Sequence, residues 1–327
     1  MTACAGSTAR PGAPGTEAGP ASRSWNKSAI VCPDTTVGET ALDCPWAGIA
    51  RELSGVAQRG ESVSDAFTDL APQIKAQLLS DSSLGSWLAL WGRSINFDEL
   101  AHGTVVDPAI LDLILGLAQV SPRQDRIAHA GIEHTYGYLF SVLKTPYGYK
   151  RARWVNDDIE TGFGLPRGTL GATPAAGTLF SNLSYFAGRI ALKEDALAQS
   201  ALALTTVTLA DEIRHFDYSG LEVRRLIETV QAPRRIELHT DIVKFKNIDP
   251  ARSNQALLIY SIVDSADASA KLITAFPVAA GFATGVFSNL GENLPVITRY
   301  NAYVEGLTAS TPPIQGSRLE VPHPAAL

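Results

Sequence analysis

The sequence predicts an α+β fold, in which a helical N-terminal part is followed by a part rich in antiparallel β-sheet and hairpins. Apolar residues recur at helical spacing between residues 45 and 120. Residues 235–245 begin with apolar residues alternating with charged ones, which is typical of a strand. Residues 257–263 and 270–278 flank a polar turn, DSADAS, which predicts a hairpin. Helices first and antiparallel strands later indicate the α+β class.

The 327-residue chain is long enough for one large core or two ordinary domains. Residues 1–28 are rich in Ala, Gly, Pro, Ser and Thr and contain almost nothing to bury, so we expect a disordered tail. We expect a helical region at 29–122 and an α+β region at 123–327. The two regions together are predicted to form one continuous catalytic domain.

The helical region has recognisable helix boundaries. Ser62, with Asp65 three residues later, predicts a helix start, and Pro72 predicts a break further along. Asp107 followed by Pro108 predicts the start of a second helix over 107–120. Each boundary depends on local backbone chemistry and not on tertiary context.

The middle of the chain is less regular. The segment 129–140, HAGIEHTYGYLF, is interpreted as a strand or the entry to one, leading into a hairpin around the Thr-Pro-Tyr-Gly turn at 145–148. The Gly/Pro-rich stretch 163–177 is expected to be a long loop, of the kind that forms lids or binding loops. The segment 178–231 contains patterns typical of both helix and strand.

Composition argues against several classes of partner. The net charge of −6 and a pI of about 5.6 disfavour a nucleic-acid partner. No apolar run is long enough for a membrane span, and no secretion signal is recognised. The three cysteines, Cys4, Cys32 and Cys44, have neither zinc nor redox spacing and are expected to be reduced thiols. We therefore expect a soluble, cytoplasmic protein, and its Arg- and Ala-rich composition suggests a bacterial source.

Nucleotide chemistry is disfavoured by the motifs. The chain has neither a GxxxxGK[ST] phosphate loop nor a GxSxG nucleophile elbow. The glycines of TGFGLPRG are wrongly spaced for a dinucleotide fingerprint. No cofactor is expected, while iron or another divalent metal stays an open alternative.

The segment 129–140 contains the leading candidate catalytic residues. His129 and Glu133 share one face whether the segment is a helix or a strand, so they could act as an acid–base pair. His134 is the alternative base, and Tyr136 or Tyr138 would donate a proton or hold an oxyanion. The alternative interpretation is that the aromatic residues pack a core while His129 and Glu133 form nearby hydrogen bonds.

The basic segment KRARW at 150–154 is the candidate substrate-binding group. Arg151 and Arg153 could hold a carboxylate or phosphate, and Trp154 could stack on a planar ring. The alternative is a solvated hairpin end with local salt bridges.

Two other groups offer metal ligands. Glu212 and His215 have the Glu-x-x-His spacing that ferritin-like di-iron proteins use, although a surface ion pair is the favoured interpretation of this spacing. Glu237, His239 and Asp241 would share one face of a strand, either as a site or as the solvent face of a one-sided sheet.

The leading hypothesis is an enzyme of small-molecule metabolism, with specialised metabolism as one option, that uses cofactor-independent acid–base chemistry on an anionic or aromatic substrate. It would be a lyase, cyclase, isomerase or hydrolase. A non-haem, di-iron-like oxygenase using Glu212 and His215 is the second hypothesis, and a non-catalytic small-molecule-binding protein is the third. The expected partner is a small-molecule substrate, with homo-oligomerisation left open.

Overall fold

The computed structural model describes part of the chain in detail, namely Trp25 and residues 45–98, 101–145, 148–150, 178–191, 221–230, 236–245, 256–264, 269–278 and 302–303. The predicted tail, 1–28, and the predicted loop, 163–177, lie outside these residues except for Trp25. The Trp25 side chain is buried, and its indole N–H donates to Asp69 at 2.8 Å.

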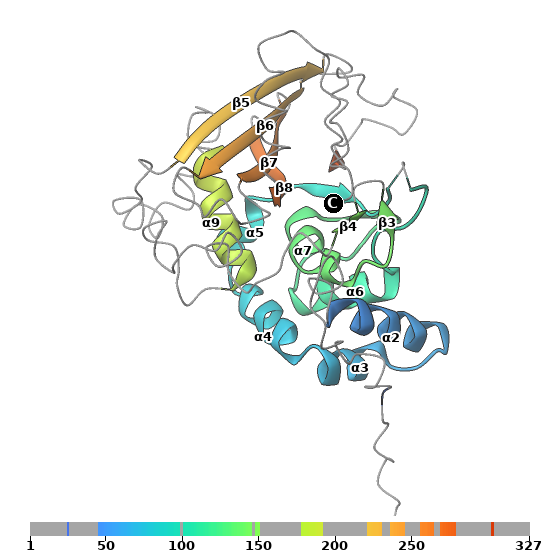
Figure 1. Cartoon of the computed structure of the whole chain (residues 1–327). Helices are drawn as coiled ribbons and strands as arrows, with labels where there is room; N and C mark the ends of the chain where they lie inside the picture. Colours follow the sequence, from blue (N-terminus) through green and yellow to red (C-terminus); the bar gives the residue numbers. More distant parts are fainter. Residues whose placement is uncertain are drawn as a thin grey trace, which may run out of the picture.

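Short helices form the first part of the chain, as predicted (Figure 1). They are α2 (Trp46–Gln58), α3 (Val63–Leu70), α4 (Pro72–Asp81), α5 (Gly85–Ala89) and α6 (Pro108–Leu117). The predicted boundaries are confirmed. Ser62 caps α3 by accepting from the Asp65 amide, Pro72 begins α4, and Asp107 caps α6 by accepting from the Ala109 amide. No helix among the described residues is long and apolar enough to cross a membrane.

The segment 129–140 is helical, so its interpretation as a strand is wrong. Strand β2 (Ile127–His129) ends at His129, the first residue of this segment. It is followed by α7 (Ala130–Thr135) and the 3₁₀ helix η2 (Gly137–Phe140). Every residue from 130 to 140 is buried. A short segment buried on all sides shows no polar face, so periodicity cannot distinguish a helix from a strand.

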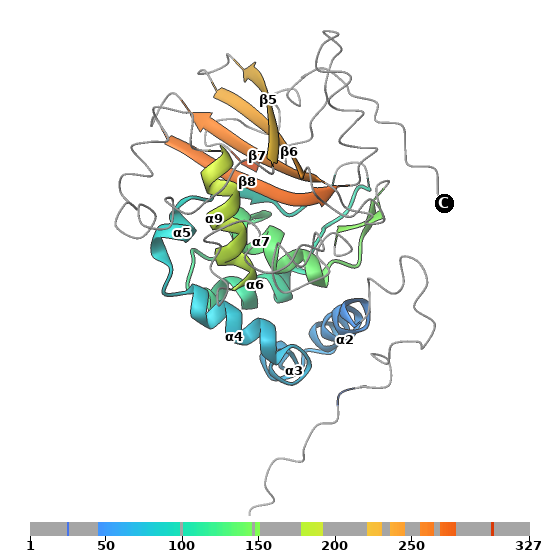
Figure 2. The same cartoon turned by 60° about the vertical axis from the view of Figure 1, so that its left-hand side comes forward.

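The C-terminal part contains a four-stranded antiparallel sheet in the order β5-β6-β7-β8, in which β6 and the β7–β8 hairpin confirm the predicted strands. Its strands are β5 (Leu221–Val230), β6 (Ile236–Phe245), β7 (Ala256–Asp264) and β8 (Ser269–Val278). Helix α9 (Leu179–Ala191) runs across one face of this sheet, with α7 and α6 beneath it and α2, α3 and α4 farthest from the sheet (Figure 2).

Two smaller antiparallel sheets lie beside the helices. One has the order β2-β1-β9 and is formed by β2, β1 (Arg93–Ile95) and β9 (Ala302–Tyr303). Arg93 lies between His129 and Tyr303 in its register. The other pairs β3 (Lys144–Thr145) with β4 (Gly148–Tyr149), so a hairpin forms at the predicted turn.

Strands β6 and β7 of the large sheet are largely buried on both faces. Ile236, Leu238 and Ile242 belong to one apolar cluster, whereas Val243 belongs to the main core together with helices α2 to α9. His239 and Asp241 lie on the same face as Val243 and are buried. The interpretation of the Glu237–His239–Asp241 face as solvent-exposed is therefore wrong. Arg225 pairs with Asp241 at 2.8 Å and donates to the last carbonyls of α9, which joins the sheet to that helix.

Candidate functional site

A group of polar side chains lies in the interior where β1, α7, η2 and the end of β4 meet. We call it the Glu133 cluster, and its members are Ser94, Asp98, Glu133, His134, Tyr138 and Lys150. All six side chains are buried. Burying this many polar and ionisable groups together is costly, and such groupings are concentrated at functional sites.

Glu133 is a strongly perturbed acid within the cluster. It projects from α7, is fully buried, and one carboxyl oxygen accepts a hydrogen bond from the Ser94 hydroxyl of β1. The other oxygen, Oε1, has no hydrogen-bond partner within the described part of the chain. Burial raises the pKa of Glu133 from 4.5 to about 7, although the Ser94 hydrogen bond and the positive charge of Lys150 both lower it. At neutral pH this carboxyl group is therefore close to half-protonated.

Lys150 supplies the positive charge of the cluster. Its Nζ lies 3.4 Å from the Asp98 carboxylate, 3.5 Å from the Tyr138 hydroxyl and 4.8 Å from the centre of the Tyr138 ring. The ring of His134 stacks on Tyr138 with centroids 4.5 Å apart. An acid, an ammonium group, a phenol and an imidazole are thus held on adjoining elements, and these groups transfer protons or stabilise an oxyanion.

His129 does not pair with Glu133, contrary to the sequence prediction. Its Nδ1 accepts from the Ile132 amide at the start of α7, and its Nε2 lies 3.0 Å from the Leu88 carbonyl. These two bonds require the tautomer with the proton on Nε2. Burial, together with the nearby charges of Lys271 and Arg93, lowers the pKa of His129 from 6.5 to about 4, although its hydrogen bond to the Leu88 carbonyl opposes this shift. The ring is therefore neutral at physiological pH and both nitrogens are engaged.

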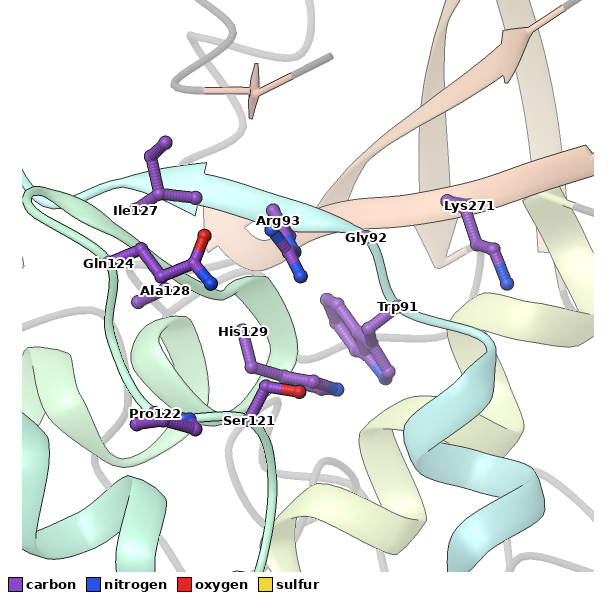
Figure 3. Close-up of a pocket in the computed structure, with 10 residues that line it drawn as sticks. All are labelled: Trp91, Gly92, Arg93, Ser121, Pro122, Gln124, Ile127, Ala128, His129 and Lys271. Atoms are coloured by element: carbon purple, nitrogen blue, oxygen red, sulfur yellow. The ribbon is translucent and has the colours of Figure 1, made fainter. Parts of the chain in front are cut away.

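His129 instead lines an open pocket of about 260 Å³ between β1, β2 and the segment around Pro122 (Figure 3). Arg93 and Lys271 also line it. Ser94 and Arg93 are neighbours in β1, so their side chains leave opposite faces of the strand. The Glu133 cluster and the pocket therefore lie on the two sides of β1.

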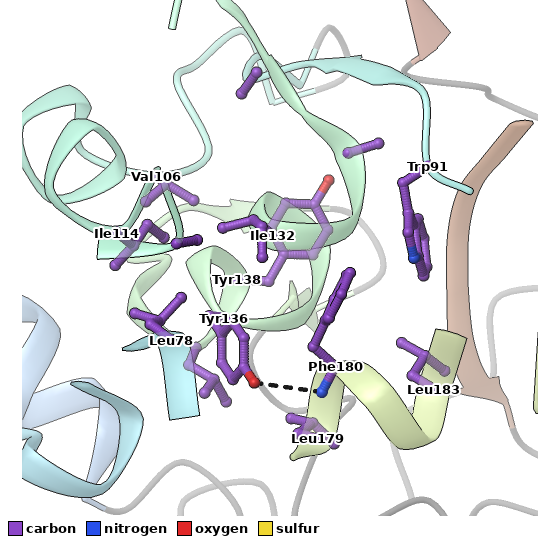
Figure 4. Close-up of a cluster of buried hydrophobic side chains, with 14 of the residues drawn as sticks. Leu78, Trp91, Val106, Ile114, Ile132, Tyr136, Tyr138, Leu179, Phe180 and Leu183 are labelled. Atoms are coloured by element: carbon purple, nitrogen blue, oxygen red, sulfur yellow. Dashed lines mark hydrogen bonds between the residues drawn. The ribbon is translucent and has the colours of Figure 1, made fainter. Parts of the chain in front are cut away.

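Tyr136 belongs to the core. Its hydroxyl donates to Asp81 at 2.5 Å and accepts from the Phe180 amide at 3.3 Å, as the dashed line in Figure 4 marks. Asp81 also accepts from Thr178, whose hydroxyl accepts from the Ser181 amide. Burial raises the pKa of Asp81 to about 6, and burial together with Asp81 raises that of Tyr136 well above 10. This network fixes the start of α9 to α4 and α7.

The remaining predicted site residues lie outside the described residues. They are the substrate-binding candidates Arg151, Arg153 and Trp154 and the metal candidates Glu212 and His215. Within the described ranges no group of three or more His, Cys, Asp or Glu side chains is arranged to hold a metal ion. The three substrate-binding candidates lie within four positions after Lys150 in the chain.

Sequence reasoning missed three members of the cluster. Lys150 opens the basic segment, but only the arginines and the tryptophan of that segment were singled out. Ser94 and Asp98 carried no signal, because a serine in a short strand and an aspartate after it are common. Ser94 contacts Glu133, which lies 39 positions later in the chain, and Asp98 contacts Lys150, which lies 52 positions later.

Comparisons with protein-family models, with curated proteins and with solved structures found no match to this chain.

Proposed function

We propose that the protein is a cofactor-independent acid–base enzyme acting on a small anionic or aromatic molecule, with Glu133 as the group that transfers the proton. The reaction class is that of a lyase, cyclase, isomerase or hydrolase. The observation that carries the proposal is the buried Glu133 carboxyl, which has one oxygen without a hydrogen-bond partner in the described part of the chain and a pKa raised to about 7.

A proton-transfer group works best when its pKa lies near the pH of the reaction, because both protonation states are then populated. Glu133 meets this condition. Ser94 holds one carboxyl oxygen in place, which leaves Oε1 as the atom that would take up or release the proton. Fixed geometry at the reacting atom is a large part of acid–base efficiency.

Lys150 and Tyr138 supply the complementary chemistry. Removing a proton from a carbon next to a carbonyl, or adding water to an acyl group, places negative charge on an oxygen. An ammonium group and a phenol held within 3.5 Å of each other could stabilise that charge. His134, stacked on Tyr138, is the second candidate for proton transfer. In this proposal Arg151, Arg153 and Trp154 hold the substrate.

The test is solvent exchange. Purified protein in D₂O is incubated with a panel of small aromatic and anionic carbonyl compounds, and deuterium uptake is followed by mass spectrometry. We expect catalysed exchange with at least one compound. Glu133→Gln should slow it by about 10²–10⁴-fold, the usual contribution of a positioned acid or base.

Glu61→Gln is the control, because Glu61 lies on the surface after α2 and pairs with Arg59. It should exchange like the wild type. Equal rates in wild type and Glu133→Gln, or no exchange across the panel, would contradict the proposal. Exchange that appears only after iron or manganese is added would favour the metal-dependent alternative.

A further inference from the structure

We propose that the pocket bordered by Arg93 and Lys271 is a binding site for a small carboxylate that has a flat, apolar body. This site lies on the other side of β1 from the Glu133 cluster. The inference does not depend on the proposed catalytic function, because it concerns binding alone.

The pocket carries positive charge. Among the described residues that line the pocket, Arg93 and Lys271 are cationic and none is acidic. Arg93 is exposed and makes no ion pair with any described residue, while the Lys271 ammonium donates to a backbone carbonyl, that of Ala89, at 2.6 Å. Neither charge is neutralised by a carboxylate in the described part of the chain. An arginine left in this state can form a bidentate pair with a ligand carboxylate.

The walls of the pocket fit a flat apolar body. Trp91, Pro122 and Ile127 supply apolar surface, while Ser121 and Gln124 supply polar groups. In Figure 3, Arg93, Trp91 and His129 point toward one space. The volume of about 260 Å³ suits a ligand of one ring with a carboxylate and is too small for a nucleotide.

The walls are also fixed before any ligand binds. Gln124 and Ile127 exchange two backbone hydrogen bonds of 3.0 and 2.9 Å, and Arg123 pairs with Asp112 of α6 at 3.0 Å. On the opposite side the Trp91 indole donates to Ser184 of α9 at 2.8 Å. A site formed in advance loses less entropy when a ligand binds.

His129 gives this site an internal reporter. The charges of Arg93 and Lys271 help to keep its pKa near 4. A bound anion would offset those charges, so the pKa of His129 should rise when the site is filled. This change can be followed by the imidazole proton resonances during a pH titration.

The test titrates the full chain with benzoate and measures binding by calorimetry and by NMR. Benzamide, a neutral molecule of the same shape, and inorganic phosphate, an anion without the ring, are the two comparison ligands. We expect saturable benzoate binding, at least about tenfold weaker binding of either comparison ligand, and a raised His129 pKa.

Three variants locate the site. Arg93→Gln should weaken benzoate binding at least about tenfold, because the bidentate partner is lost. Lys271→Gln retains a donor for the Ala89 carbonyl but removes the charge, and it should weaken binding severalfold. Arg51→Gln, at an exposed position on α2, is the control and should bind like the wild type. Circular dichroism confirms that each variant is folded.

Benzoate that fails to saturate by roughly 10 mM, a concentration that fills a site of millimolar affinity, would overturn the inference. So would equal binding of benzoate and benzamide, or wild-type binding by Arg93→Gln. Phosphate binding tighter than benzoate would show that the ligand class is wrong.

Discussion

The hydroxyl of Ser94 donates to the carboxyl of Glu133, which joins strand β1 to helix α7 in the buried interior. The other carboxyl oxygen of Glu133 has no hydrogen-bond partner among the described residues. The arrangement fixes the carboxyl group and at the same time leaves it able to exchange a proton. It also ties the stability of the protein to the protonation of Glu133.

Stability should depend on pH through Glu133. Because its pKa is raised from 4.5 to about 7, the folded state binds the proton more tightly than the unfolded state. The stability that this proton provides is fully present below pH 4.5, falls as the pH rises, and is lost above about pH 7. The loss amounts to about 3 kcal/mol.

Urea unfolding of wild type and Glu133→Gln across this pH range measures the effect. The difference in their free energies of unfolding should change between pH 4.5 and 7 and be flat above. Taking the difference removes the contributions of two other groups to the pH dependence of stability. Asp81, whose pKa is raised, lowers stability as the pH rises from 3.8 to about 6. His129, whose pKa is lowered, lowers stability as the pH falls from 6.5 to about 4. A pH-independent difference would show that Glu133 titrates normally.

Tyr136→Phe should destabilise the fold without affecting proton transfer. The substitution removes a donor to Asp81 and an acceptor for the Phe180 amide, both buried, which should cost about 1–3 kcal/mol. Tyr303→Phe is the matched control, because Tyr303 makes no hydrogen bond with its hydroxyl among the described residues. Loss of catalysed exchange in folded Tyr136→Phe would mean that Tyr136 is catalytic after all.

His129→Ala should lower the free energy of unfolding by about 2 kcal/mol, since it removes the cap of α7 and the bond to the Leu88 carbonyl. His129→Asn should recover part of this loss, because asparagine is a good helix cap. Thermal and urea unfolding of both variants provide the measurement. If His129→Ala is as stable as the wild type but inactive, the residue is catalytic and not structural.

Gly131 should tolerate no larger side chain. A Cβ atom there would lie 2.6 Å from the Trp91 ring and 2.7 Å from the Phe180 ring. Gly131→Ala should therefore destabilise by about 1–3 kcal/mol or more, because the core would be overpacked. Gly116 lies exposed in α6 with nothing near its Cβ position, so Gly116→Ala should stabilise by about 0.5–1 kcal/mol. Equal effects at the two glycines would contradict the packing described.

The parts of the fold that could be predicted were those set by local chemistry. Ser62, Pro72 and Asp107 mark helix ends because each acts through its own backbone neighbourhood. Strands β6, β7 and β8 of the large sheet were also identified, because their β-branched and aromatic composition is local, whereas β5 lies in the segment 178–231, whose pattern fits both helix and strand. Segment 129–140 was misassigned because burial on every side removes the pattern that distinguishes a helix from a strand.

The candidate site could be predicted only in part. Glu133, His134 and Tyr138 were singled out because polar residues are dense in that segment. Their partner Ser94 lies on β1 and their partner Lys150 directly follows β4, and no spacing in the sequence reveals these contacts. The predicted pairing of His129 with Glu133 was wrong because His129 caps the helix that Glu133 occupies, so its nitrogens bond to backbone groups.

The most direct test of the account is the titration of the Glu133 carboxyl itself. Difference infrared spectra or carboxyl carbon NMR, recorded from pH 4 to 9 with Glu133→Gln to assign the signal, give its pKa. The account predicts a value of about 7 that rises further in Ser94→Ala, because the hydrogen bond from Ser94 favours the charged form. A value near 4.5 that does not change in Ser94→Ala would contradict it.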